Sequence, residues 1–257
     1  MEIAKLVEIM KALRGQEGCP WDREQTRESL KPFLIEETYE VLEAIDEGDP
    51  EKIREELGDL LFQIIFHCQI ATEREEFNIN DVIKGISDKM LARHPHVFGK
   101  EKYETSEEVM DKWEEHKKRE GKLKGSLLDG VPDGLPALLR AHRLQDRASR
   151  VGFDWDVVDD VITKLEEEVV EFKKALRDMK GPDIEDELGD IFFALVNISR
   201  FVGINPEDAL RKTISKFIKR FRHIEITAAD SGRTLSDMTL EEMDGLWESS
   251  KSDEKRS

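Results

Sequence analysis

Ten acidic residues form two groups of five with the same internal spacing. Each acid of the first group is matched by an acid 131 positions later. Residues three or four apart lie on one face of an α-helix, so we expect each group to occupy two helices, with its carboxylates on one face of each. The matched pairs are Glu36 with Glu167, Glu37 with Glu168, Glu40 with Glu171, Glu56 with Glu187, and Asp59 with Asp190.

A turn separates the two helices of the first group. It contains Gly48, Asp49 and Pro50, and these residue types commonly reverse the chain. The helices should therefore form a hairpin that brings four or five carboxylates to one point. Crowded carboxylates repel one another and take up protons unless a cation neutralises them. Oxygen ligands without Cys or His suit a hard divalent ion, which predicts Mg²⁺ sites with Mn²⁺ as a substitute cofactor. The expected ligands in the first half are Glu36, Glu37, Glu40, Glu56 and Asp59.

Apolar residues surround the later acids of each group. Helices that are apolar nearly all round must be largely buried, and their surface is too extensive for the few other helices to cover. We therefore expect a homodimer in which acidic hairpins pair into a four-helix bundle. Gly58 and Gly189 lie inside these helices and suggest close approach of the backbone to a partner or ligand. The apolar neighbours include Leu57, Leu60 and Leu61 in the first half and Leu188, Phe192 and Phe193 in the second.

Basic and aromatic residues also recur. Lys216 and Arg220 are four residues apart, and Lys89 and Arg93 precede them by 127 positions. In so acidic a chain, paired cations near a metal site are typical of a phosphate clamp, because arginine presents a fork to two oxygens. Salt bridges with the surplus acids are the alternative. Trp247 could stack on a nucleobase or anchor the core.

Helical periodicity dominates the chain and strand alternation is nearly absent, which predicts an all-α fold. We expect two tandem helical domains, 1–120 and 137–250, joined by a Gly- and Pro-rich linker, 121–136, and followed by a disordered charged tail, 251–257. The expected helices are 1–13, 29–47, 50–75, 80–93 and 106–119 in the first half, and 137–150, 158–179, 184–201, 206–226 and 241–250 in the second.

Composition narrows the classes of partner. The formal net charge of −18 over 257 residues argues against a nucleic-acid polymer or an anionic membrane as partner, since both require a basic surface. Cys19 and Cys68 provide no framework of disulfides or zinc ligands. No apolar stretch reaches the length of a membrane span, and Met1–Arg14 reads as an amphipathic helix rather than a signal peptide. These features predict a cytoplasmic protein.

The duplicated acidic pattern resembles that of the MazG-type nucleoside triphosphate pyrophosphohydrolases, an all-α class. Gly18-Cys-Pro-Trp-Asp22 and Arg93-His-Pro-His-Val-Phe98 are similar to that family too. The resemblance implies hydrolysis of a nucleoside triphosphate to the monophosphate and pyrophosphate with Mg²⁺. It also implies roles for residues of the second half. Glu168, Glu171, Glu187 and Asp190 would bind metal, and Lys164, Lys216, Arg220 and Trp247 would contact the nucleotide.

The two halves are not equivalent. Lys164 lies one helical turn before Glu168, whereas the position 131 earlier is Phe33. We therefore expect the second half to be the main catalytic centre, with Glu167 as a candidate base that accepts a proton from the attacking water. No base-reading motif is visible, which predicts broad base specificity. A non-catalytic acidic helical adaptor or metal-binding interaction module is the alternative, because acidic helical repeats also serve as interaction surfaces.

Overall fold

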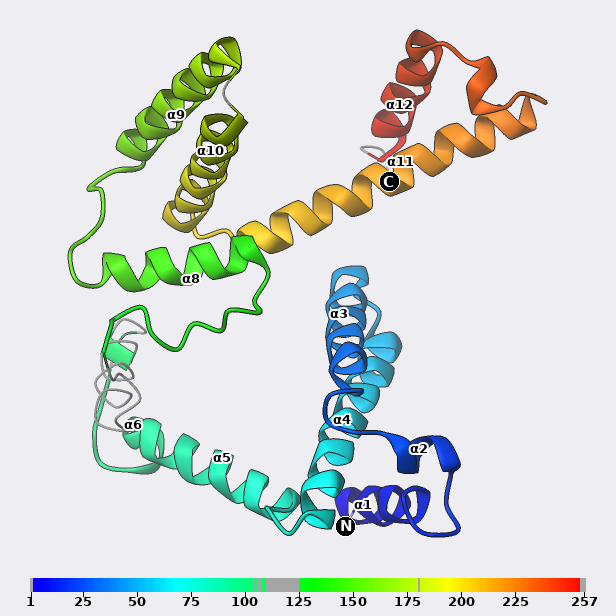
Figure 1. Cartoon of the computed structure of the whole chain (residues 1–257), viewed down its shortest axis with the longest axis vertical. Coiled ribbons are helices and arrows are strands. Elements are labelled where there is room, and N and C mark those ends of the chain that lie inside the picture. Colours follow the sequence, from blue (N-terminus) through cyan, green and yellow to red (C-terminus); the bar gives the residue numbers. More distant parts are fainter. Residues whose placement is uncertain (1, 104, 106–107, 110–124, 180, 255–257) are drawn as a thin grey trace. The chain divides into compact units, whose positions relative to one another are not determined.

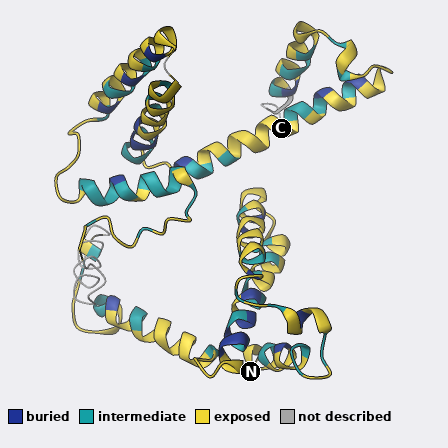
Figure 2. Cartoon of the chain, viewed as in Figure 1, coloured by how far each residue is buried: buried dark blue, intermediate teal, exposed yellow. Residues whose placement is uncertain are grey.

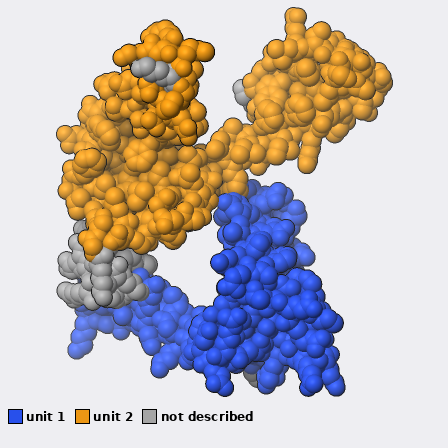
Figure 3. Space-filling model, viewed as in Figure 1, with its two compact units in different colours: residues 1–116 blue, residues 117–257 orange. Residues whose placement is uncertain are grey.

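The computed structural model describes residues 2–103, 105, 108–109, 125–179 and 181–254. Every regular element in this part of the chain is a helix, so the all-α prediction is confirmed. The chain divides into two compact units, residues 1–116 and 117–257 (Figure 3). Among the described helices, none combines the length and the apolar character needed to cross a bilayer.

Unit 1 is built around the hairpin of α3 and α4 (Figure 1). Helix α3 ends at Gly48, whose φ of 72° lies in the left-handed region that glycine adopts without strain. Asp49 then caps α4 by accepting a hydrogen bond from the backbone N–H of Glu51, and Pro50 occupies the first turn. The helices of unit 1 are α1 (Glu2–Leu13), α2 (Pro20–Glu24), α3 (Lys31–Glu47), α4 (Pro50–Glu73), α5 (Ile79–Arg93) and α6 (Pro95–Phe98).

The core of unit 1 lies at the C-terminal half of α4. Helix α1 packs against α4 there, and the burial of these side chains stabilises the unit through the hydrophobic effect. Its fully buried side chains are Met10, Leu30, Ile65, Phe66 and Ile70. The acidic half of α4 lies outside this core.

Unit 2 repeats the hairpin with α9 and α10. Helix α8 packs against α10, and the long helix α11 carries α12. Asn205 caps α11 by accepting hydrogen bonds from the N–H groups of Glu207 and Asp208. The elements of unit 2 are α8 (Ala137–Ser149), α9 (Val158–Asp178), α10 (Gly181–Phe201), α11 (Pro206–Asp230), the 3₁₀ turn η1 (Leu235–Asp237) and α12 (Leu240–Glu254).

Some element boundaries differ from the sequence expectation. The segment 14–28, which lies between two expected helices, contains the short helix α2, which Pro20 starts. Helix α12 continues to Glu254, into the segment expected to be a disordered tail, and an ion pair between Lys251 and Glu248 supports this last turn. The helix expected over 106–119, with Trp113, lies almost entirely outside the described residues.

Much of each acidic hairpin is exposed (Figure 2), and the exposed residues include large apolar side chains. Leu57 is 50% exposed and Phe192 is 52% exposed. The expectation that these helices are largely buried is therefore wrong for a single chain. The reason is that each hairpin has neighbours over only part of its length, with α1 on α4 and α8 on α10.

Candidate functional site

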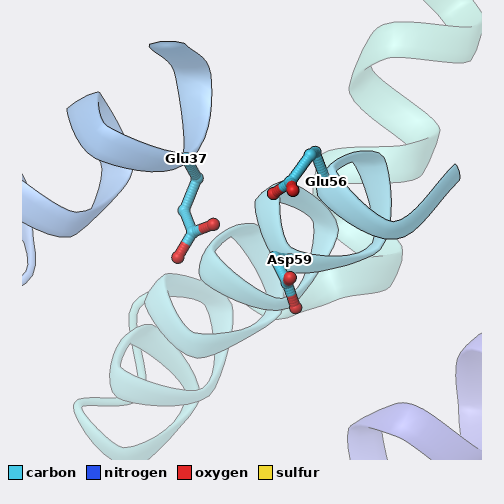
Figure 4. A group of neighbouring side chains, drawn as sticks. All are labelled: Glu37, Glu56 and Asp59. Atoms are coloured by element: carbon cyan, nitrogen blue, oxygen red, sulfur yellow. The ribbon is translucent and has the colours of Figure 1, made fainter. Parts of the chain in front are cut away.

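The first cluster of carboxylates lies on the hairpin of unit 1. Glu37 extends from α3 toward α4, which carries Glu56 and Asp59 (Figure 4). One oxygen from each of these three side chains lies within 4.8 Å of the others. The turn at Gly48 makes this meeting possible, because it sets the two helices antiparallel.

The second cluster repeats this arrangement on α9 and α10. Carboxylate oxygens of Glu168, Glu171 and Glu187 lie within 4.8 Å of one another. Glu168 is only 6% exposed, and the Lys164 ammonium lies 2.7 Å from its carboxylate. This hydrogen bond raises the pKa of Lys164. A buried carboxylate requires such a partner, since desolvation makes an isolated charge costly.

Crowding and burial perturb the second cluster. The pKa of Glu187 is raised above its ordinary value, first by partial desolvation and then by the negative charges of Glu171, Glu168 and Asp190. Asp190 therefore acts on the cluster electrostatically, although it is not one of the three residues with converging oxygens. The arrangement favours a cation, which would relieve this repulsion.

The first cluster shows the same effect. The pKa of Glu37 is raised mainly by burial, and the charges of Glu40 and Asp59 add to the shift. The pKa of Glu56 is raised by desolvation and then by Glu40 and Asp59. Gln63 lies beside Glu37, with 3.5 Å between the amide nitrogen and the carboxylate oxygen. An uncharged amide thus contacts the first cluster, whereas a lysine contacts the second.

The leading acid of each group does not join its cluster. Glu36 and Glu167 are both exposed, and neither belongs to the converging sets. Glu167 lies 3.5 Å from the Lys164 ammonium. Glu36 was predicted to bind metal in the first half, and the structure does not bring it to Glu37, Glu56 and Asp59. The reason is helical rotation, because adjacent residues point in directions about 100° apart.

A cavity of about 420 Å³ adjoins the second cluster. Lys164, Glu168 and Asp190 contribute to one part of its lining, and the remainder is mainly apolar and aromatic. Sequence reasoning missed several of these lining residues, because most of them come from α8 and from the loop 150–157, outside the acidic hairpin, and one lies near the end of α10. The missed residues include Leu144, Gln145, Phe153, Asp154 and Arg200.

Polar contacts hold the loop of this cavity against α10. Arg200 forms an ion pair with Asp154, and its Nε donates to Oδ1 of Asn197 at 3.0 Å. Asn197 is buried. Its amide is therefore oriented by the arginine, and the loop that carries Trp155 is tied to the helix that carries Asp190.

The paired cations of the second half lie apart from the second cluster. Lys216 and Arg220 belong to α11, which extends from the end of α10 (Figure 1). The Arg220 guanidinium lies over the Trp247 ring, 5.5 Å from its centroid, and Phe217 also contacts that ring. Neither cation nor Trp247 lines the cavity beside Glu168. Within the described chain, these predicted nucleotide contacts form a separate group.

The cations of the first half are also separate from their cluster. Helix α5 extends from the C-terminal end of α4, whereas Glu56 and Asp59 lie in the N-terminal half of α4 (Figure 1). Arg93 is only 6% exposed. The structure therefore does not bring Lys89 and Arg93 to the first cluster, and burial of Arg93 argues against a phosphate-binding role.

The donor set of both clusters fits a hard divalent cation. Each offers at least three carboxylate oxygens within 4.8 Å of one another, and Mg²⁺ prefers oxygen ligands. Burial raises the pKa values of Glu37 and Glu187, and the neighbouring carboxylates add to both shifts, so a nearby positive charge would favour the ionised forms. Glu168, Glu171 and Glu187, with Asp190 nearby, are the candidate ligands in unit 2.

Comparison with known proteins agrees with this site. A family model described as the MazG nucleotide pyrophosphohydrolase domain matches residues 25–98 and 158–225, which contain the two hairpins. Three relatives are similar over nearly all of this chain. The Thermotoga maritima protein named nucleoside triphosphate pyrophosphohydrolase/pyrophosphatase MazG is 47% identical, covering 96% of this chain and 94% of that protein. The Escherichia coli K12 nucleoside triphosphate pyrophosphohydrolase is 44% identical, with 98% of both chains covered. The YabN protein of Bacillus subtilis is 49% identical over this whole chain, which spans 53% of that protein. The chain therefore belongs to the MazG nucleotide pyrophosphohydrolase family.

Proposed function

We propose that this protein hydrolyses nucleoside triphosphates to nucleoside monophosphates and pyrophosphate, with Mg²⁺ as cofactor and Mn²⁺ as a substitute. The observation that carries the proposal is the meeting of Glu168, Glu171 and Glu187 beside a cavity that also presents Lys164. Oxygen ligands for a cation, a lysine and a neighbouring apolar space are the parts that a triphosphate with an attached nucleoside requires. Two relatives that share almost the full length bear names that state this activity.

Different residues of unit 2 have different roles in the proposed reaction. When bound, Mg²⁺ supplies positive charge to the triphosphate oxygens and acidity to the attacking water. Glu168, Glu171, Glu187 and Asp190 would hold that ion. Lys164 neutralises charge that develops on the phosphates, because its ammonium already lies at the cluster. Glu167 stands outside the converging oxygens, so it is free of the ion and can accept the proton of the water.

Unit 2 is the proposed principal catalytic centre. Unit 1 has Phe33 at the position that corresponds to Lys164, and the uncharged amide of Gln63 contacts Glu37. A nucleotide at this cluster would therefore not meet the lysine that unit 2 provides. Charge-assisted contacts to phosphate are worth about 1.5–3 kcal/mol each. The acids of unit 1 are proposed to bind Mg²⁺ without fast turnover. They are Glu37, Glu40, Glu56 and Asp59.

We also propose that the protein acts as a homodimer. The exposed apolar faces of the α3–α4 and α9–α10 hairpins support pairing of hairpins into a four-helix bundle. Lys216, Arg220 and Trp247 keep their proposed role of contacting the nucleotide. Because they lie apart from Glu168 in one chain, we propose that they serve the cluster of the second copy.

The test is hydrolysis by the full-length protein of a panel of the common ribo- and deoxyribonucleoside triphosphates with Mg²⁺, Mn²⁺ or no metal. Chromatography of the products distinguishes release of pyrophosphate from release of phosphate. Broad base specificity predicts similar rates across the panel. A protein that binds Mg²⁺ but releases no pyrophosphate from any nucleotide would support the acidic adaptor or metal-binding interaction module instead.

The duplicated sequence provides a matched control. Glu168→Gln should lower kcat/KM by about 100-fold or more, since even the outer partners of metal ligands are worth about 10- to 100-fold. Glu37→Gln makes the same change 131 positions earlier and should leave most of the activity. Equal losses in the two variants would show that both units turn over substrate.

A further inference from the structure

Gln145 is a buried amide with one unused hydrogen-bonding atom. Its Nε2 donates to the backbone oxygen of Phe193 at 2.8 Å. A carbonyl oxygen only accepts, so this bond sets the orientation of the amide. The remaining atom, Oε1, is buried and has no partner among the described residues. Since Gln145 is only 8% exposed, this acceptor is costly to leave unpaired.

The cavity that Gln145 lines is suited to a flat aromatic ring. Phe153, Trp155, Leu144 and Val161 contribute apolar lining. Glu168 and Asp190 border the same cavity, so a ligand held at the second cluster by its phosphates can extend into the apolar part. Aromatic side chains stack on nucleobases, and this attraction does not depend on which base is present.

We propose that this cavity receives the nucleobase of the substrate and that Oε1 of Gln145 accepts a hydrogen bond from an N–H group of the base. This inference rests on the proposed function and specifies how the same site reads its substrate. Adenine and cytosine present an exocyclic amino group, and guanine and uracil present a ring N–H, on their pairing edges. An acceptor alone therefore demands a donor on the base without choosing among the common bases.

The sequence of unit 1 has no amides at the positions 131 before the two amides of this cavity. The positions 131 before Gln145 and Asn197 are Arg14 and Phe66. Phe66 is buried in the core, and the Arg14 guanidinium lies over its ring, 5.3 Å from the centroid. Arg14 also pairs with Glu73 at 2.6 Å. Phe66 and Arg14 therefore pack together in unit 1, and neither provides an amide.

The test compares three nucleotides on the wild-type protein: ATP, purine riboside triphosphate, which lacks only the 6-amino group, and 2′-deoxy-ATP. Both kcat/KM with Mg²⁺ and the dissociation constant are measured. Leaving a buried acceptor unpaired should lower kcat/KM and affinity for purine riboside triphosphate by about 5- to 100-fold relative to ATP. Equal values for these two nucleotides would overturn the proposal. A loss with 2′-deoxy-ATP alone would overturn it too, because Gln145 would then bind the sugar.

Gln145→Met provides the second measurement. It should weaken the binding of ATP and abolish the discrimination against purine riboside triphosphate. Gln69→Met, at a half-buried position on α4 of unit 1, should change neither. If Gln145→Met still discriminates between the two nucleotides, the amino group of adenine donates to another residue, and the proposal is overturned. If the proposed function is wrong, the protein releases no pyrophosphate from ATP. The ratio of the dissociation constants for purine riboside triphosphate and ATP then still tests the contact with Gln145. Binding of neither nucleotide would refute both.

Discussion

The ionisation of Glu187 contributes to the pH dependence of the protein's folding stability. Its pKa in the folded chain is raised, so the folded state binds more protons than the unfolded state between the two values. The stability that Glu187 contributes is therefore fully present below its ordinary pKa of 4.5 and is lost as the pH rises through the raised value.

Glu187→Gln should remove this dependence. Without metal, the variant should melt at a higher temperature than the wild type at pH 7 and at the same temperature near pH 4. Mg²⁺ should reverse the order at pH 7, because it stabilises only the intact cluster. Thermal melts by circular dichroism between pH 4 and 8 measure both effects, with Glu167→Gln as the control outside the cluster. A variant that melts lower than the wild type at pH 7 without metal would contradict the repulsion that we infer.

Gly189 tests whether another surface approaches the α10 backbone. A Cβ atom built there meets no atom within 4 Å in the single chain, and the same is true at Gly58. Replacing a helical glycine by alanine then stabilises by about 0.5–1 kcal/mol, which raises the melting temperature by a few degrees. We expect this gain for Gly189→Ala without metal or nucleotide. A lower melting temperature would indicate that a second copy packs on this backbone in solution.

At the scale of elements, one ion pair secures the junction of α11 and α12. Arg233 donates from Nη1 and Nη2 to the two carboxylate oxygens of Glu242, at 2.8 and 3.1 Å. This contact, followed by hydrogen bonding to the backbone of Thr239, lowers the pKa of Glu242 to about 2. The junction matters for function because α12 carries Trp247 and α11 carries Arg220.

The stabilisation from Glu242 should be complete above its ordinary pKa of 4.5 and should disappear as the pH falls toward about 2. Glu242→Gln should therefore melt below the wild type at pH 6, and the difference should shrink between pH 4.5 and 3. Glu241→Gln, at the adjacent position on the same helix, is the control. A difference that stays constant down to pH 3 would show that the pair contributes no pH-dependent stability.

At the scale of the whole molecule, the exposed hairpin faces predict association. Light scattering at micromolar concentration should give about twice the chain mass of 29.7 kDa. Phe192→Lys, on the exposed face of α10, should shift the mass toward the monomer, whereas Leu240→Lys, at the start of α12, should not. A monomer for the wild type would contradict the proposed bundle.

Mixing two inactive variants tests the proposed sharing of residues between copies. Glu168→Gln and Arg220→Ala each damage every site of their own dimer. If Arg220 serves the cluster of the second copy, each mixed dimer regains one intact site, and random exchange restores about a quarter of the wild-type activity. Activity that stays at the level of the separate variants after exchange would assign Arg220 to the cluster of its own chain.

The sequence by itself determined the local features of this protein. Helical class, the two hairpins and the duplicated acids all follow from patterns that span a few turns of helix. The turn at Gly48, Asp49 and Pro50 also follows, because cap and turn preferences depend on adjacent residues. The acidic motifs that resemble the MazG family are also local, and the family model matches the segments that contain them.

Only the tertiary structure decided which of these residues meet. Helical rotation leaves Glu36 outside the cluster to which spacing alone assigns it. Lys216 and Arg220 share the repeat but lie along α11, away from Glu168. The amide of Gln145 is oriented by Phe193, 48 positions later. Contacts between such distant positions depend on how helices cross and pack, and periodicity within each helix carries no information about that crossing.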